Sequence, residues 1–357
     1  MSPEHNLMTC RRILLIRLSS LGDILLTTPI LRLLREHCPQ AKIDFLLKAA
    51  YQDVLRAHPC INRLIPFNDQ QSLWQSLRLL RQKRYDVVLD LHRTLRSRLI
   101  CLGLAAPLKL AYHKRVLRRQ LLVRLGWNTL GAMTPVPELY AAPLRRRGID
   151  AELPPLEMHL APGSRDAMRQ HLAQAFPATA ERPLLALAPG ARWATKRWPA
   201  ERFAAVAQAL SNRCRAGVVI LGDGDDSALA QAICQRLEVP VYDASGKFSL
   251  MQTAALLQQC RLLISNDSGL MHMATALNVP VVAVFGPTVE AFGFYPFRAQ
   301  AQVVSTNLAC RPCSTKGSQA CPRGHHHCML NVSTDQVLAA AQQMWETEAR
   351  PDDPSAI

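Results

Sequence analysis

Apolar runs of strand length alternate with amphipathic segments of helical period along almost the whole chain, and this alternation constrains the fold more than any other feature. The first part contains three expected strands, ILLI at 13–16, KIDFLL and YDVVLDL, and a helix is expected over Ile24–Leu34. The second part repeats the scheme with PLLALAP, GVVILG, PVYDA, RLLIS and VVAVFG, and with helices such as Ala200–Leu210. Strands that alternate with helices predict an α/β fold whose mostly parallel sheets are covered on both faces.

A proline-rich segment separates these two parts. DAELPPLEMHLAPGSR follows Gly148 and has no clear period, which is typical of a linker. A chain of 357 residues is long enough for two domains. We predict them at residues 1–160 and 161–357, with packing of the last helix against the first domain as an alternative. Ligands of such sheets bind beyond the carboxyl ends of the strands, so we expect a site in a crevice between the domains.

Two strand-to-helix turns carry candidate catalytic and phosphate-binding residues. RLSSLGD places Asp23 at a helix start, where it is either a first-turn acid favoured by the helix dipole or a carboxylate able to accept a proton. APGARWATKRWP, Ala188 to Pro199, contains Gly190 near its start and offers Arg192, Lys196 and Arg197, cations that could neutralise a diphosphate or could simply be solvated. The single glycine of the first turn excludes the G-x-G-x-x-G dinucleotide fingerprint there.

Two further turns are rich in side chains that bind hydroxyls or cap helices. In LGDGDDSALAQAI, Asp225 and Asp226 could accept ribose hydroxyls or serve as N-caps. In SNDSGLMHMATAL, an apolar strand signal breaks at Asp267, Ser268 and Gly269 and then resumes at helical spacing, with His272 one turn into the helix. Such a turn is either an ordinary helix cap or a place where backbone amides hold a phosphate.

The charge of the chain is concentrated in one region. Between His92 and Arg147 there are twelve Lys or Arg residues and one acid, Glu138, so this region carries +11 of the net +15. It predicts a surface for nucleic acid, an anionic membrane or an anionic acceptor, with a solvated basic face as the alternative. A helix-turn-helix or RNA-binding motif is not evident, which disfavours nucleic acid.

The apolar N-terminal run and the cysteines bear on location and metals. Arg17 and Asp23 interrupt the apolar run ILLIRLSSLGDILL, so we expect neither a signal peptide nor a spanning helix. We therefore expect a cytoplasmic protein.

Seven cysteines lie among apolar segments and are expected to behave as small core hydrophobes. The other four are clustered in CRPCSTKGSQACPRGHHHC, where the first pair suits zinc but the later spacings do not repeat it; they are Cys310, Cys313, Cys321 and Cys328. Reduced thiols that pack a loop are the preferred interpretation, with structural zinc as the alternative, and His325–His327 are expected to be solvated.

Three segments make the chain similar to a known family. RLSSLGDILLTTPILRLLRE, PGARWATKRWPAERF and SNDSGLMHMATALNVPVVAVFGPT resemble, in order and spacing, the bacterial lipopolysaccharide heptosyltransferases of glycosyltransferase family 9. The resemblance implies the GT-B arrangement of two facing Rossmann-like domains. It also implies inverting transfer of heptose from ADP-L-glycero-D-manno-heptose to the inner core of lipopolysaccharide, without a metal or other cofactor. The acceptor would be an anionic, lipid-linked sugar, reached by peripheral contact with the inner face of the inner membrane.

The resemblance also implies roles for individual residues. Asp23 would be the general base, Lys196 would hold the donor phosphates, and Asp267 would contact the sugar. Ser268 and Gly269 would offer amides to the diphosphate, Phe248 would pack on adenine, and Asp226 would bind ribose in the place of an acidic residue that is often glutamate in the family. We add Gly190, Arg192 and His272 to the donor site from their turns. We expect the acceptor to bind the basic region through Arg93, Arg96, Lys114, Arg118 and Arg119. The alternatives are a transferase of the same fold that uses another nucleotide sugar and a basic nucleic-acid-binding protein.

Overall fold

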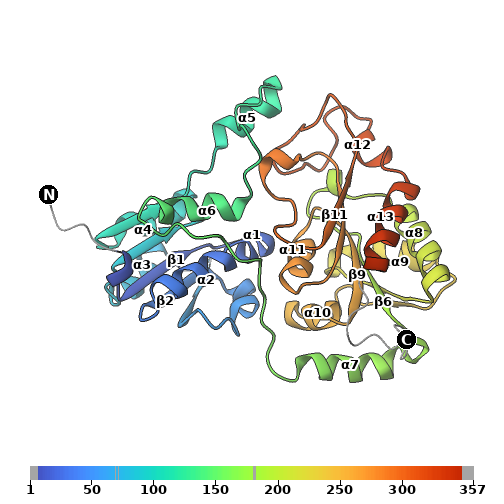
Figure 1. The fold of residues 1–357 in the computed structure, drawn as a ribbon, viewed down its shortest axis with the longest axis horizontal. Coiled ribbons are helices and arrows are strands. Elements are labelled where there is room, and N and C mark those ends of the chain that lie inside the picture. The colour runs from blue at the N-terminus through green and yellow to red at the C-terminus, as the bar shows by residue number, and fades with distance from the viewer. Residues whose placement is uncertain (1–6, 69, 71, 180–181, 348–357) are drawn as a thin grey trace. The chain divides into compact units, whose positions relative to one another are not determined.

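The computed structural model describes residues 7–68, 70, 72–179 and 182–347, and its chain forms two compact units (Figure 1). The first unit contains the residues up to Val116 together with Thr134–His159. The second contains Leu117–Met133 and the residues from Leu160 onward. The segment between Leu117 and Met133, which the sequence places in the first domain, therefore groups with the second unit by its contacts.

The first unit is built on a five-stranded parallel sheet with the order β3-β2-β1-β4-β5. Its strands are β1 (Arg12–Ile16), β2 (Lys42–Lys48), β3 (Arg63–Phe67), β4 (Val87–Asp90) and β5 (Leu108–Ala111). Its helices are α1 (Leu21–Leu25), α2 (Thr28–His37), α3 (Leu73–Arg81), α4 (Leu95–Gly103) and α6 (Val136–Arg145), with 3-10 turns η1 (Leu7–Thr9) and η2 (Ala49–Leu55). The central strand β1 is apolar without alternation because both of its faces are covered. On one face, Leu14 and Ile16 pack with Leu77, Leu80 and Ile100 of α3 and α4.

The helix expected over Ile24–Leu34 is instead two helices, and this prediction was wrong. α1 ends at Leu25 and α2 begins at Thr28. Pro29 in the first turn of α2 has no backbone N–H, so it cannot continue the i to i−4 hydrogen bonds of α1 by donating to the Leu25 carbonyl. The hydroxyls of Thr27 and Thr28 donate instead to the carbonyls of Ile24 and Leu25, 2.6 and 2.8 Å away.

The second unit is built on a six-stranded parallel sheet with the order β11-β10-β9-β6-β7-β8. Its strands are β6 (Leu184–Ala188), β7 (Gly217–Ile220), β8 (Val241–Asp243), β9 (Cys260–Asn266), β10 (Val281–Phe285) and β11 (Ala301–Ser305). Its helices are α5 (Val116–Leu125), α7 (Ser164–Ala175), α8 (Ala200–Cys214), α9 (Ser227–Cys234), α10 (Leu250–Leu257), α11 (Gly269–Ala276), α12 (His327–Leu330) and α13 (Thr334–Thr347). The 3-10 turns are η3 (Pro177–Thr179), η4 (Ala194–Lys196), η5 (Gly224–Asp226) and η6 (Glu290–Phe292).

The core of the second unit lies between one face of this sheet and the helices α8 and α13. Alternate residues of each strand, such as Leu185 and Leu187, pack there against Trp198, Phe203 and Trp345. The last helix, α13, contacts α8, β9, β10 and β11, so it belongs to this core. Among the described residues, no helix has both the length and the apolar composition needed to cross a bilayer.

Candidate active site

In each sheet the strand order reverses once, and the predicted site residues lie beyond that point. The chain leaves β1 and moves toward one edge, then returns to start β4 on the other side of β1. In the second sheet the corresponding neighbours are β6 and β9. Ligands of parallel α/β sheets bind outside the carboxyl ends of the strands at such a switch point. Asp23 follows β1, Lys196 follows β6 and Asp267 follows β9.

In the first unit, Asp23 is held by Arg17 and Ser20. An Arg17 guanidinium nitrogen lies 2.6 Å from Asp23 Oδ2, and the exposed fractions of the two side chains are 7% and 21%. The Ser20 hydroxyl donates to the same oxygen over 3.0 Å, and the Ser20 amide over 3.3 Å. Arg17 is fixed in turn because it donates to the Leu91 carbonyl over 2.6 Å and lies over the ring of Tyr140.

These contacts keep Asp23 ionised. Burial alone would raise its pKa, but the charge of Arg17 and the hydrogen bonds from Ser20 outweigh burial and lower it. Asp23 is also the N3 residue of a capping box with Ser20, so the expected first-turn acid is present. The structure therefore holds a partly accessible carboxylate at the switch point, deprotonated at neutral pH.

His92 is a neighbour of this carboxylate that the sequence interpretation missed. Its pKa is lowered to about 4 by burial and then by the cations Arg17 and Lys114, while Asp23 opposes the shift. His92 is consequently neutral at pH 7. Buried Asp90, the last residue of β4, accepts hydrogen bonds from the amides of His92 and Arg93, each at 2.9 Å, and so fixes the turn that carries both.

In the second unit, Lys196 and Asp267 form a pair across the switch point. Lys196 Nζ lies 2.5 Å from Asp267 Oδ2, and the exposed fractions of the side chains are 13% and 9%. The hydroxyl of Thr288, which follows β10, donates to the same oxygen over 2.8 Å. The sequence interpretation missed Thr288, since nothing near it marks its partner 21 residues away.

The turn from β9 into α11 leaves its first amides without a side-chain cap. Ser268 is the N-cap residue of α11 but makes no side-chain hydrogen bond to the helix, and its hydroxyl lies 3.2 Å from that of Ser265. Ser268 and Gly269 are half-buried, and His272 in the next turn is buried. Asn266 fastens the turn, because its side chain donates to the Pro189 carbonyl over 2.7 Å and accepts from the Trp198 amide over 3.1 Å.

Gly190 and Asp226 meet at the ends of β6 and β7. A side chain at Gly190 would come within 2.1 Å of the Asp226 carboxylate, so glycine is required there for this packing. Asp226 also accepts from the Asp223 amide over 3.3 Å, as an N-terminal capping residue does. Burial and the neighbouring charge of Asp223 raise the pKa of Asp226.

Phe248 belongs to an aromatic cluster rather than standing alone. Its ring centroid lies 5.3 Å from that of His171 and 6.4 Å from that of Tyr242, and Phe248 is half-buried. Arg192 is exposed and lies over the ring of Trp193, while Arg197 donates to the Ala191 carbonyl over 2.9 Å. Of the three cations in this loop, Lys196 is therefore the one paired with a carboxylate at the strand ends.

The five predicted acceptor residues are divided between the units. Arg93, Arg96 and Lys114 belong to the first unit, and Arg118 and Arg119 to the second. Arg96 is exposed over the ring of Phe67. Arg118 is exposed on α5. Arg119 donates to the Phe292 carbonyl over 3.0 Å and lies over the rings of Phe292 and Phe294.

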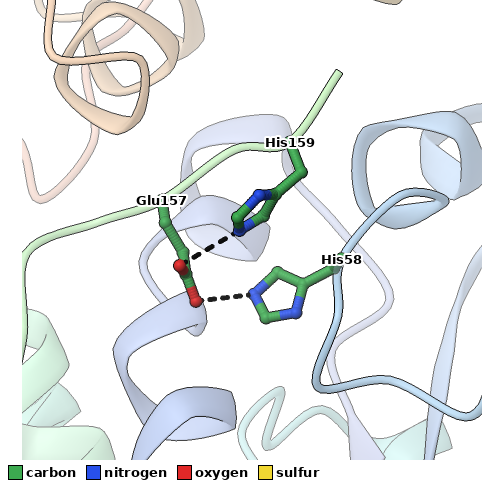
Figure 2. A group of neighbouring side chains, drawn as sticks. All are labelled: His58, Glu157 and His159. Carbon is green, nitrogen blue, oxygen red and sulfur yellow. Dashed lines mark hydrogen bonds and ion pairs between the residues drawn. The ribbon is translucent and has the colours of Figure 1, made fainter. Parts of the chain in front are cut away.

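A second polar cluster in the first unit joins His58, Glu157 and His159 (Figure 2). The Glu157 carboxylate contacts both rings, 3.2 Å from His58 Nε2 and 3.0 Å from His159 Nε2, and the three ligand atoms have the spacing of a metal site. However, Arg32 donates to both Glu157 oxygens, and the Cys60 amide donates to His58 Nδ1, which leaves the ring hydrogen on Nε2. Hydrogen bonds and the close His58–Glu157 contact thus account for the cluster, and it anchors the linker segment to the first unit.

Comparison with known proteins gives consistent similarities over most of the chain. The sequence model of glycosyltransferase family 9 (heptosyltransferase) matches residues 72–322. Lipopolysaccharide heptosyltransferase 2 of Salmonella typhimurium is 28% identical over 355 residues, which cover 94% of this chain and 99% of that protein. The solved structure of a family 9 glycosyl transferase from Veillonella parvula has a TM-score of 0.78 at 25% identity, covering 95% of this chain and 98% of that one. The structure of E. coli ADP-heptose lps heptosyltransferase II has a TM-score of 0.76 at 25% identity, covering 95% of this chain and 100% of that one. The predicted α/β fold class, GT-B with two Rossmann-like units, is confirmed.

Proposed function

Because the chain belongs to glycosyltransferase family 9, the heptosyltransferases, we propose that it transfers heptose from ADP-L-glycero-D-manno-heptose to a sugar of the lipopolysaccharide inner core, with inversion at the anomeric carbon. The relatives named above are lipopolysaccharide heptosyltransferases, which supports the class of donor and acceptor. The observation that carries the proposal is the Lys196–Asp267 pair beside the uncapped start of α11.

The second unit binds the ADP-sugar. Lys196 is mostly buried, so its charge is weakly screened and acts strongly on a diphosphate brought beside it. The uncapped amides at Ser268 and Gly269 meet the same anion at the positive end of the helix dipole. Asp267 is then placed to accept sugar hydroxyls, and Phe248 with its aromatic neighbours packs on adenine. Since these groups meet the diphosphate charge, the proposed reaction uses no metal cofactor.

Asp23 acts as the general base. The acceptor hydroxyl attacks the anomeric carbon from the face opposite the leaving group, and its proton passes to an Asp23 oxygen. The bond from the anomeric carbon to the phosphate oxygen breaks, and ADP leaves with the electron pair, stabilised by Lys196 and the α11 amides. The lowered pKa of Asp23 makes it a weak base, so its contribution comes from its position at the reacting hydroxyl and from being ionised at neutral pH.

The first unit binds the anionic acceptor. Arg93 lies in the turn that Asp90 fixes after β4, and Lys114 is close enough to His92 to lower its pKa. His92 also interacts with Asp23, so these cations surround the same strand ends as the proposed base. Carboxylate or phosphate groups of the inner core would be held there by charge-assisted hydrogen bonds.

The acceptor is lipid-linked, and the α3–α4 surface of the first unit is suited to an anionic membrane. We define this surface by the exposed Trp74, Leu95 and Leu102, whose exposed fractions are 73%, 76% and 72%, together with the exposed Arg96 and Arg98. Apolar side chains beside cations are the composition of peripheral membrane-binding surfaces. The protein would therefore act at the cytoplasmic face of the inner membrane, by peripheral contact.

The test is a direct transfer assay. The protein is incubated with ADP-heptose and defined acceptors that end in Kdo or in heptose, and the products are analysed by mass spectrometry and by the anomeric coupling in NMR spectra. A single added heptose of inverted configuration is expected on one acceptor class. ADP-mannose and UDP-glucose serve as donor controls. Transfer from a control donor but not from ADP-heptose would contradict the proposal.

A further inference from the structure

A row of cations lies at the edge of the first sheet where its strands begin. The strands β3, β2, β1 and β4 are parallel neighbours in that order, so their starts lie side by side, about 4.8 Å apart. Each strand carries one or two basic residues in its first position or just before it. We call these six residues the basic row, and along the sheet they are Arg63, Lys42, Arg11 with Arg12, and Lys83 with Arg84.

Two open cavities adjoin each other within the basic row. Their volumes are about 360 and 340 Å³, and Arg12 and Lys83 line both of them. Every member of the basic row lines at least one of the two cavities. Among the described residues that line them, the acids are Asp44 and Asp86, so the lining carries a net charge of +4.

The two acids are held by neutral donors rather than by the cations. Asp86 Oδ2 accepts from the backbone amides of Arg11 and Arg12 over 2.7 and 2.8 Å. Asp44 Oδ2 accepts from the Tyr85 hydroxyl over 2.7 Å. The acids therefore fix the backbone around the cavities, and they leave the side chains of the basic row without a carboxylate partner.

Within the described residues, no side chain of the basic row forms an ion pair or donates a hydrogen bond. Neighbouring arginines of the same unit behave differently. Arg32 on α2 donates to the Glu157 carboxylate, and Arg35 on α2 donates to the Cys60 carbonyl over 2.9 Å. The basic row thus keeps its donors available, although like charges at this spacing repel one another and oppose folding.

The chemistry of the two cavities matches phosphate groups. Guanidinium and ammonium groups that lack protein acceptors form strong, charge-assisted hydrogen bonds with phosphate oxygens. The four strand starts extend over about 14 Å, which is longer than a single phosphate. Two cavities that share Arg12 and Lys83 provide places for at least two phosphate groups with common donors between them.

We propose that the basic row binds a ligand that carries two or more phosphate groups, at a site separate from the proposed donor and acceptor sites. Because the strands are parallel, the basic row is at their amino ends, whereas Asp23 follows the carboxyl end of β1. The five residues of β1 alone span about 13 Å. The ligand is a soluble polyphosphate or a group of phosphate headgroups on a lipid surface, and these two sources share the same chemistry.

Calorimetry of the intact protein with sodium tripolyphosphate tests the proposal. Lys42→Gln/Lys83→Gln removes one cation from a single cavity and one that both cavities share, so the affinity should fall at least about tenfold. Arg165→Gln/Arg169→Gln removes two exposed cations of α7 in the second unit. It is the matched control and should bind as the wild type does. Raising the salt concentration should weaken binding to the wild type, since salt screens the attraction.

Hydrogen exchange measured by mass spectrometry locates the bound anion, because tripolyphosphate can also enter the proposed diphosphate site beside Lys196. Slower amide exchange is expected in residues 11–12, 42–43 and 82–86 of the wild type, and not in Lys42→Gln/Lys83→Gln. Equal affinity of the wild type and this variant, or slower exchange in the second unit alone, would overturn the proposal. The result does not depend on whether the sugar donor is ADP-heptose.

Vesicles separate the two sources of phosphate. Phosphatidylcholine vesicles with and without phosphatidic acid are added to the wild type in the presence of tripolyphosphate. Displacement of tripolyphosphate by the phosphatidic acid vesicles alone, lost in Lys42→Gln/Lys83→Gln, identifies lipid headgroups as the ligand. Tripolyphosphate binding that both kinds of vesicle leave unchanged identifies a soluble polyphosphate.

Discussion

The Arg17 guanidinium lies 2.6 Å from the Asp23 carboxylate, and both side chains are mostly buried. An ion pair of this kind holds the carboxylate in one orientation and keeps it ionised, but it also lowers the affinity of Asp23 for a proton. The pair therefore favours a base that acts through its position rather than through a high pKa. Because Arg17 lowers the pKa and Asp23 accepts the proton, substitutions at the two residues should have different effects on the reaction.

Asp23→Asn should abolish transfer and leave donor binding nearly unchanged. The amide keeps the shape of the side chain and a hydrogen bond to Ser20, but it cannot accept the acceptor proton, and general bases contribute about 10²–10⁴-fold. Transfer is measured by ADP release and ADP affinity by calorimetry. Ser20→Ala, which removes one hydrogen bond to Asp23, is the control and should retain most activity. Near wild-type turnover of Asp23→Asn would remove this residue from the mechanism.

Arg17→Gln should move the acidic limb of the pH–rate profile upward. Arg17 makes the largest of the contributions that offset the effect of burial on Asp23, so its loss raises the pKa of Asp23. The activity of a general base is lost as pH falls through its pKa. In the wild type, the Asp23 limb is expected below the ordinary range of a carboxyl group. In Arg17→Gln, kcat/KM should begin to fall at a higher pH. Arg17→Lys retains the charge and should resemble the wild type, and identical profiles for all three proteins would refute the coupling.

Some of this site follows from local sequence and some does not. Asp23, Lys196 and Asp267 could be predicted because each lies in a turn that directly follows an apolar strand, and the switch point then brings two of these turns together. Their partners could not be predicted, because Lys196 and Asp267 are 71 residues apart and Thr288 carries no local signal. The edge strands β3, β5 and β11 were missed for another reason: half-exposed strands lack the continuous apolar pattern of the central ones.

Lys196→Ala should weaken donor binding and also slow transfer, because the diphosphate carries charge when bound and gains more in the transition state. A charge-assisted contact is worth about 1.5–3 kcal/mol, which corresponds to a roughly 10- to 150-fold loss of ADP affinity. Arg192→Ala in the same loop removes an exposed cation and is the matched control, with a much smaller effect. Calorimetry that shows unchanged ADP affinity for Lys196→Ala would contradict the assignment.

Glu157→Gln should destabilise the protein at neutral pH but not in acid. The pKa of Glu157 is lowered from 4.5 to about 2: burial would raise it, but His58, Arg32 and His159 outweigh burial. A lowered folded pKa gives stability that is present above the unfolded value and is lost as pH falls toward the folded value. The free energy of unfolding of Glu157→Gln should thus be lower than that of the wild type by about 1–3 kcal/mol above pH 5. This difference should shrink between about pH 4.5 and 2. Exposed Glu36→Gln is the control, and a difference that stays constant down to acid pH would exclude this account.

Reversing the charge of the α3–α4 surface should loosen binding to anionic vesicles. Arg96 and Arg98 are exposed on α4 among the apolar side chains of that surface, and each cation near an anionic surface contributes about 1 kcal/mol. Arg96→Glu/Arg98→Glu should therefore bind phosphatidylglycerol vesicles at least about tenfold more weakly at low salt, with less difference at high salt, since salt screens the attraction. Trp74→Ala should weaken binding at both salt concentrations, because its contribution is apolar burial. Arg165→Glu/Arg169→Glu makes the same charge change on α7 of the second unit and should bind vesicles much as the wild type does. If the α4 and α7 variants lose binding equally, net charge rather than the α3–α4 surface governs membrane contact.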